Sequence, residues 1–173
     1  MRLIDPMIAE LEQEAETTRR CLERIPEDKL SWRPHPKSMS LGQLGLHIAT
    51  IPGGVAAVAA ADSMERPEFD RPMPRSKREV LDALTESVAA ALKFLRGLDD
   101  ARAAGSWTMT LEGKPVFSLP RTGVVRNLML NHWYHHRGEF QVYLRLLDVP
   151  VPSVYGPTAD ENPFAAAPAG RAP

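Results

Sequence analysis

A nine-residue stretch in the second half of the chain holds three of the protein's five histidines, all within five residues. It reads Asn131-His132-Trp133-Tyr134-His135-His136-Arg137-Gly138-Glu139. His132 and His136 are four residues apart, so on a helix their side chains lie on the same face, one turn apart. Apolar residues continue that face on both sides at helical spacing, namely Val125, Met129, Phe140, Tyr143 and Leu147. The pattern therefore predicts that both imidazoles lie on the apolar face of a core helix.

Two imidazoles on an apolar face leave ring nitrogens that need partners, and two interpretations account for them. The histidines can be ordinary core residues that are hydrogen-bonded to their neighbours, or they can hold a metal ion. Zinc, nickel and iron all accept imidazole nitrogen. One more histidine from a neighbouring helix would complete a three-nitrogen site, which leaves coordination positions open for water or substrate.

His47 is the candidate for the third ligand. Residues 40–61 carry apolar side chains at helical spacing, and Ser40 with Gln43 fits a capping box at the start of that helix. His47 borders the apolar face. Pro52 follows five residues later and predicts a kink that opens space beside the imidazole.

Three other residues have simpler interpretations. Trp133 stands where zinc peptidases with a His-Glu-x-x-His motif place their general base, so the sequence does not predict a protease. His35 lies between two prolines, which favours an exposed loop. Cys21 lies at the edge of the apolar face of the first helix and is interpreted as a small residue beside the core. Because Cys21 is the only cysteine, no intramolecular disulfide can form.

Hydrophobic spacing predicts an all-α fold with four amphipathic helices, at residues 3–25, 40–61, 76–98 and 120–147. We therefore expect an antiparallel four-helix bundle. Residues 106–119 contain alternating Thr, Met and Leu around Glu112-Gly113-Lys114, which predicts a short β-hairpin or an extended excursion before the last helix. We expect one domain over residues 1–160. Residues 161–173 are rich in alanine and proline and are predicted to be a disordered tail.

The composition excludes several classes of partner. The formal net charge is -1, which gives no electrostatic basis for binding nucleic acid or an anionic membrane. We expect no apolar run to approach the roughly 20 residues that a bilayer requires. The chain becomes acidic by Glu10, so residues 1–10 do not resemble the apolar region of a signal peptide. A cytoplasmic location is the expectation.

Two internal segments and the C-terminal part of the chain resemble the DinB-like superfamily. They are Ser38-Met39-Ser40-Leu41-Gly42-Gln43-Leu44-Gly45-Leu46-His47-Ile48-Ala49, the histidine-rich stretch quoted above, and Tyr143-Leu144-Arg145-Leu146-Leu147-Asp148-Val149-Pro150-Val151-Pro152-Ser153-Val154-Tyr155-Gly156-Pro157. The resemblance implies a four-helix bundle of the DinB type, usually dimeric. It also implies a divalent metal held by three histidines, which on motif position correspond to His47, His132 and His136.

One departure from the family concerns Glu139, because the family commonly has glutamine there. Glu139 lies three residues after His136 and faces the same side, so it is a candidate fourth ligand, acid/base group or hydrogen-bond partner of an imidazole. Arg137 is a candidate for binding an anionic substrate, with a salt bridge to a neighbouring helix as the alternative. His135 is expected beside the site or at an interface rather than as a ligand.

The resemblance implies a metal-dependent enzyme, either a transferase that uses a low-molecular-weight thiol or a hydrolase. In either case the three-histidine site would activate a thiolate or a water. Zinc or nickel is the expected ion, with iron and manganese as alternatives. The expected partners are a small-molecule substrate and a second copy of the chain. The alternative is a non-catalytic metal-binding or stress-response protein with the same fold and site.

Overall fold

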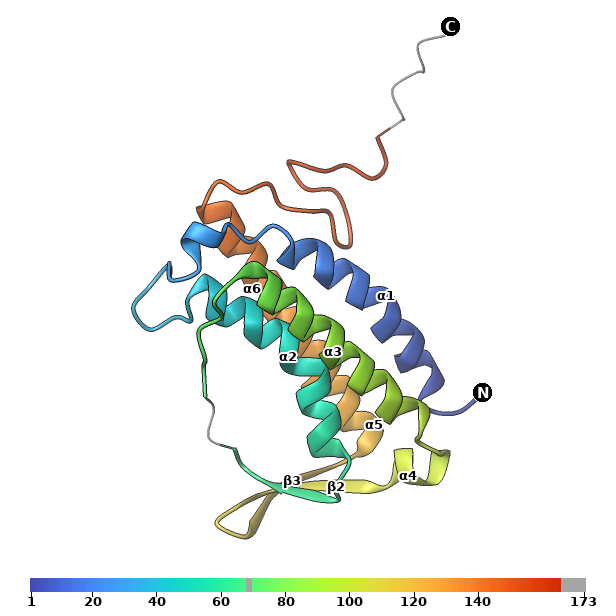
Figure 1. The fold of residues 1–173 in the computed structure, drawn as a ribbon. Coiled ribbons are helices and arrows are strands. Elements are labelled where there is room, and N and C mark those ends of the chain that lie inside the picture. The colour runs from blue at the N-terminus through green and yellow to red at the C-terminus, as the bar shows by residue number, and fades with distance from the viewer. Residues whose placement is uncertain (68–69, 166–173) are drawn as a thin grey trace, which may run out of the picture.

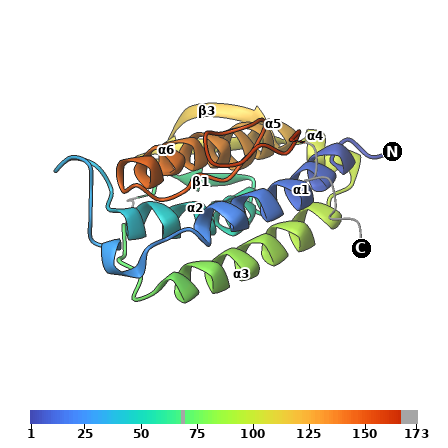
Figure 2. The same cartoon turned by 90° about the horizontal axis from the view of Figure 1, so that it is seen from above.

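The computed structural model describes residues 1–67 and 70–165. The protein is mostly helical and also has a small three-stranded sheet. Three of the long helices are α1 (Asp5–Leu22), α2 (Leu41–Ala59) and α3 (Lys77–Arg96). The fourth long helical segment is continuous and consists of α5 (Arg121–Val124), the π-helix η2 (Val125–Asn131) and α6 (His132–Leu146). These segments lie side by side, with α1 and α2 each packed against both α3 and α6 (Figures 1 and 2).

The helices begin where the sequence predicts. The Ser40 hydroxyl accepts a hydrogen bond from the Gln43 backbone N–H (3.2 Å), while the Gln43 side chain accepts one from the Ser40 N–H (3.0 Å). This capping box satisfies two N–H groups that have no partner inside the helix. Ser76 caps α3 in a similar way, through the N–H of Glu79 (3.1 Å). The remaining short helices are the 3₁₀-helix η1 (Glu27–Lys29) and α4 (Asp100–Ala104).

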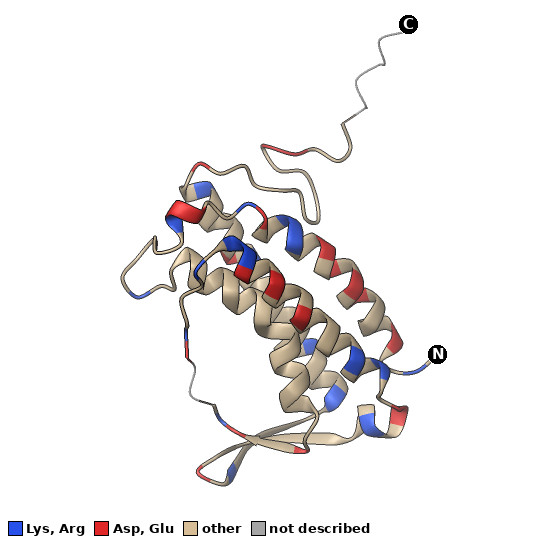
Figure 3. Cartoon of the chain, in the orientation of Figure 1, with Lys and Arg blue, Asp and Glu red and all other residues tan. Residues whose placement is uncertain are grey.

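Helix α2 lies at the centre of the fold and contains no Lys, Arg, Asp or Glu (Figure 3). It is long and apolar enough to cross a membrane by length and composition alone, which corrects the expectation that no apolar run approaches that length. Half of α2 is buried inside the protein, and a helix in the core of a folded protein has the same length and apolar composition as a membrane-spanning one. Gly53 lets α2 approach α3: its N–H donates to the Ser87 hydroxyl at 2.7 Å, and an added Cβ would lie 3.0 Å from the Ser87 Cα.

The predicted hairpin is present. Strands β2 (Ser106–Leu111) and β3 (Lys114–Pro120) are antiparallel, and the turn residues Glu112 and Gly113 both have positive φ, as tight hairpin turns require. A third strand, β1 (Ser63–Glu65), pairs parallel to β2 and gives the order β1–β2–β3. The sequence did not predict β1, because three residues are too few to show a period.

Two side chains join the end of α2 to the sheet and to α5, which follows the sheet. The buried Arg121 guanidinium donates hydrogen bonds to the carbonyls of Ala59 and Ala61 at the end of α2. The fully buried Trp107 of β2 donates its indole N–H to the Val58 carbonyl of α2 at 3.0 Å. Both therefore use carbonyl groups near the C-terminus of α2, some of which have no partner inside the helix.

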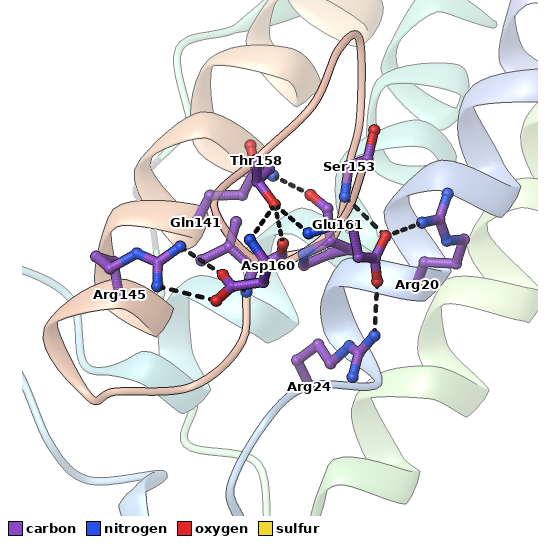
Figure 4. A network of polar contacts seen from close by, with 10 residues as sticks. Arg20, Arg24, Gln141, Arg145, Ser153, Thr158, Asp160 and Glu161 are labelled. Atoms are coloured by element: carbon purple, nitrogen blue, oxygen red, sulfur yellow. Dashed lines mark hydrogen bonds and ion pairs between the residues drawn. The ribbon is translucent and has the colours of Figure 1, made fainter. Parts of the chain in front are cut away.

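The segment after α6 runs back along the helices (Figure 1). Its Glu161 carboxylate accepts hydrogen bonds from Arg20 (2.6 Å) and Arg24 (2.9 Å) of α1 and its vicinity, and Asp160 pairs with Arg145 of α6 (Figure 4). The domain boundary at residue 160 and the tail after it stay predictions, and residues 166–173 of that tail lie outside the described residues.

Candidate metal centre

The histidine-rich stretch begins where a π-helix ends, and this changes which residues face the core. The buried side chains of α6 are Trp133, Arg137, Phe140, Tyr143 and Leu144. His132 and His136 are half-buried and lie beside that row. The expectation that they lie on the buried face is therefore wrong. The buried face lies one residue further along, which is a rotation of about 100° around the helix. Over Val125–Asn131 the wider π turn alters the angle between residues that an α-helix would give.

Three imidazoles converge at this border between α2 and α6. The Nε2 atoms of His132 and His136 are 2.9 Å apart. The ring centroid of His47, from α2, lies 4.6 Å from that of His136 and 5.2 Å from that of His132. One nitrogen from each of the three rings lies within 4.8 Å of the others. The structure thus brings together the three residues that the sequence and the family resemblance identified as ligands.

The hydrogen bond made by Glu139 decides which nitrogen of His136 is available. Its Oε2 lies 2.5 Å from His136 Nδ1, and since a carboxylate only accepts hydrogen bonds, Nδ1 carries the proton. The lone pair of His136 is then on Nε2, the atom that faces His132. A carboxylate that orients a histidine through its far nitrogen is the usual support of a metal-ligating imidazole. The donor set and its orientation fit a divalent ion.

The three imidazoles are uncharged near neutral pH. Burial, followed by the proximity of His136 and His132, lowers the pKa of His47 to about 4. Burial is also the main cause that lowers the pKa of His132 and of His136, although Glu139 partly offsets it for His136. Neutral imidazole is the form that binds metal ions, so burial keeps the site ready to accept one.

Glu139 and His135 lie on the outer side of the three histidines. His135 is 65% exposed, and its Nε2 lies 3.7 Å from Glu139 Oε2. His135, His136 and Glu139 form a second, more exposed group with ligand atoms within 4.8 Å of one another. Of the three roles left open for Glu139, its short contact with His136 Nδ1 corresponds to the hydrogen-bond partner of an imidazole.

Removing the Glu139 carboxylate should weaken metal binding without abolishing it. We expect Glu139→Ala to raise the metal dissociation constant by about 10- to 100-fold, because His136 loses the partner that orients its ring. Glu139→Gln keeps a hydrogen-bond acceptor, so its metal dissociation constant should lie between those of the native protein and Glu139→Ala. Competition with a chromophoric chelator measures the effect, and Glu16→Ala on the exposed side of α1 is the control. An unchanged affinity in Glu139→Ala would show that the carboxylate has no part in the site.

Arg137 is not brought to the histidines. Its side chain is 2% exposed and pairs with Glu14 of α1 at 2.6 Å. It also donates to the Thr18 hydroxyl, and its guanidinium lies 5.2 Å from the ring centroids of Tyr134 and Tyr155. Of the two interpretations of Arg137, the structure therefore shows the salt bridge to a neighbouring helix.

The other candidates occupy ordinary positions. Trp133 is fully buried and donates its indole N–H to the Ile48 carbonyl at 2.9 Å. Cys21 is buried in the core, and the loss of hydration there raises the pKa of its thiol to about 11. His35 lies in an exposed loop, where its Nδ1 accepts a hydrogen bond from the Lys37 N–H.

One residue near the site was missed by the sequence analysis. Arg71 lies close enough to lower the pKa of His47 and His136 by its charge. With Asp70 and Gln43 it lines a cavity of about 90 Å³ beside His47, and the Gln43 side chain donates to the Arg71 carbonyl at 2.7 Å. Arg71 is in a loop between two helices, where no periodic pattern relates it to residues distant in the chain.

Comparison with known structures agrees with this fold. A DinB-like protein from Bacillus cereus superposes with a TM-score of 0.67 and 25% identity, covering 83% of this chain and 92% of its own. A DinB-like protein from Bacillus subtilis gives a TM-score of 0.66 at 17% identity, covering 86% of this chain and 96% of its own. At that level of identity the second likeness shows the fold alone.

Sequence comparison places the chain in a family. The uncharacterized protein YrdA of Bacillus subtilis (strain 168) is 25% identical over 163 residues, which span 91% of each chain. The family model of the DinB superfamily matches residues 10–140, a range that contains His47, His132, His136 and Glu139. Because this match spans well over half of the chain, the protein belongs to the DinB superfamily.

Proposed function

We propose that this protein is a metal-dependent enzyme that binds one divalent ion through His47, His132 and His136. The observation that carries the proposal is the convergence of three uncharged imidazoles from two helices, one of them oriented by a carboxylate. Within this proposal the long helices form an antiparallel four-helix bundle of the DinB type that carries the site. The ion is zinc or nickel, both of which accept imidazole nitrogen.

The proposed reaction is the transfer of a low-molecular-weight thiol to an electrophile, or else a hydrolysis. When bound, the ion supplies Lewis acidity, which makes a thiol or a water a stronger nucleophile at neutral pH. Three histidine donors leave positions open on the ion, unlike a closed structural site. The presence of a cavity beside His47 and His132 supports access for a small molecule to this open side.

The protein's own residues have separate tasks in this proposal. His47 comes from α2, and His132 and His136 come from α6, so the packing of these two helices sets the spacing of the donors. Glu139 holds the His136 ring by accepting the proton of Nδ1 in a hydrogen bond. Apolar residues line the cavity beside His47 and His132, so the ion would lie next to a largely apolar surface.

An assay with paired substrates tests the proposal. Protein purified without a histidine tag and loaded with zinc or nickel is incubated with a panel of thiols and model electrophiles. We expect thiol-dependent turnover that falls by more than about 100-fold in His132→Ala, because the nucleophile loses its activating group. Equal rates for the native protein and His132→Ala would remove the enzymatic role for those substrates. Metal binding without turnover would favour the non-catalytic alternative. The homodimer and the cytoplasmic location remain predictions.

A further inference from the structure

A cavity of about 310 Å³ opens beside His47 and His132. It lies between α2, the π-helix and the small sheet, so the sheet forms a wall that the helices alone would not supply. The side chains that form the walls are apolar and come from each of these elements, namely Ile51, Val55 and Val58 of α2, Leu128 of η2, and Met64, Trp107 and Met109 of the sheet.

The polar side chains in the walls already have partners. The Thr50 hydroxyl lies 3.0 Å from the Leu46 carbonyl and 3.2 Å from that of His47, to which it donates. The Trp107 indole N–H donates to the Val58 carbonyl. None of the described residues that line the cavity is a lysine, arginine, aspartate or glutamate. The polar end of the cavity is therefore the end formed by His47 and His132, where the ion of the proposed function would lie.

The size and polarity of the cavity restrict what it can bind. Its volume is at the lower end of the range of about 300–1,000 Å³ for small-molecule sites. It is roughly twice that of a cavity known to hold benzene, about 150 Å³. A charged or highly hydroxylated molecule would lose its hydration here without gaining hydrogen bonds in return. An aromatic molecule of one or two rings, or a branched aliphatic one, would instead gain from burial.

We propose that this cavity binds the uncharged, apolar body of the substrate, with its one polar reacting group directed at His47 and His132. This inference rests on the proposed function, in which those histidines hold the catalytic ion. It narrows the electrophile to a neutral hydrophobic compound and excludes sugars, nucleotides and free amino acids as the molecule in this cavity.

Gly54 offers a direct test, because it lines the cavity and an added Cβ would meet nothing within 4 Å. The Cβ of a leucine at this position therefore has room, and the side chain would add bulk at the cavity wall. The probe is N-phenyl-1-naphthylamine, a neutral molecule that fluoresces when it enters an apolar site. We expect Gly54→Leu to weaken its binding by about tenfold or more. Gly138→Leu is the matched control: Gly138 is an exposed glycine of α6 where an added Cβ also meets nothing, and binding should change by less than about twofold.

A second variant and a second probe complete the test. Met109→Trp fills the cavity from the sheet and should give the same loss as Gly54→Leu. The 8-sulfonate derivative of the probe has the same rings with an added negative charge and should bind at least about tenfold more weakly to the native protein. Equal probe binding by native protein and both filled variants would overturn the assignment, as would equal binding of the charged and neutral probes.

Metal content distinguishes this inference from the proposed function. Gly54→Leu should keep its metal while losing the probe, because the substitution touches none of the three ligands. If the native protein bound the probe in the cavity but no metal, the proposed function would fail and the apolar site would stand. If it bound metal but Gly54→Leu left probe binding unchanged, the apolar site would fail and the metal site would stand.

Discussion

Replacing His132 by alanine is expected to weaken divalent-metal binding by more than about 100-fold, which exceeds the usual effect of removing a supporting residue outside the ligand shell. His132 Nε2 lies 2.9 Å from His136 Nε2, so its loss leaves one donor on α6 and one on α2. His47→Ala and His136→Ala should have effects of the same size, because each removes one of three equivalent donors. Competition with a chromophoric chelator on tag-free protein measures the three constants.

Two other histidines serve as controls for this result. His35 lies in an exposed loop, and His135 is 65% exposed and in contact with Glu139 rather than with His47. We expect His35→Ala to leave the metal dissociation constant unchanged. His135→Ala should change it by less than about tenfold, the lower limit for removing a supporting residue. Comparable metal retention in His35→Ala and in the three ligand variants would contradict the assignment.

The second large effect concerns stability. Arg137→Met should lower the free energy of unfolding by about 3–5 kcal/mol, because it leaves the Glu14 carboxylate buried without its cation. The side chains of Arg137 and Glu14 are 2% and 8% exposed, and their ion pair is 2.6 Å long. Urea denaturation measures the loss. In the double variant Glu14→Leu/Arg137→Met no charge remains unpaired, and most of the stability should return.

An exposed pair of the same type provides the comparison. Arg78 and Asp82 of α3 lie 3.4 Å apart, with side chains 88% and 63% exposed, so Arg78→Met should change stability by less than about 0.5 kcal/mol. A loss below about 1 kcal/mol in Arg137→Met would contradict a structural role for the buried pair. Folded Arg137→Met should keep its metal affinity, because the guanidinium contacts α1 and Tyr155 and not the histidines.

Much of this fold follows from local sequence. Helix periodicity, the capping box at Ser40 and the turn at Glu112-Gly113 predict the long helices and the hairpin, because each depends on neighbouring residues. The strand β1 depends instead on pairing with β2, more than 40 residues away, and its three residues show no period.

In the site, too, some features follow from neighbouring residues and others from contacts between residues that are distant in the chain. The four-residue spacing of His132 and His136 predicts that they share a face, and the family resemblance adds His47. The sequence did not reveal that the buried row passes through Trp133 and Arg137. The predicted row and the observed row share Met129 and Phe140, and they differ by only one position in the residues between these two. A π turn has no sequence signature of its own, and Arg137 is buried only because Glu14 on α1 is there to pair with it.

X-ray absorption at the metal edge of tag-free protein shows directly whether three histidines hold a divalent ion. We expect one divalent ion per chain, with three imidazole nitrogens at about 2.0–2.1 Å and at least one further light atom from solvent. His132→Ala prepared in the same way should lose this signal. Substoichiometric metal in the native protein, together with a melting temperature that does not change after chelation, would rule out a metal site at the three histidines.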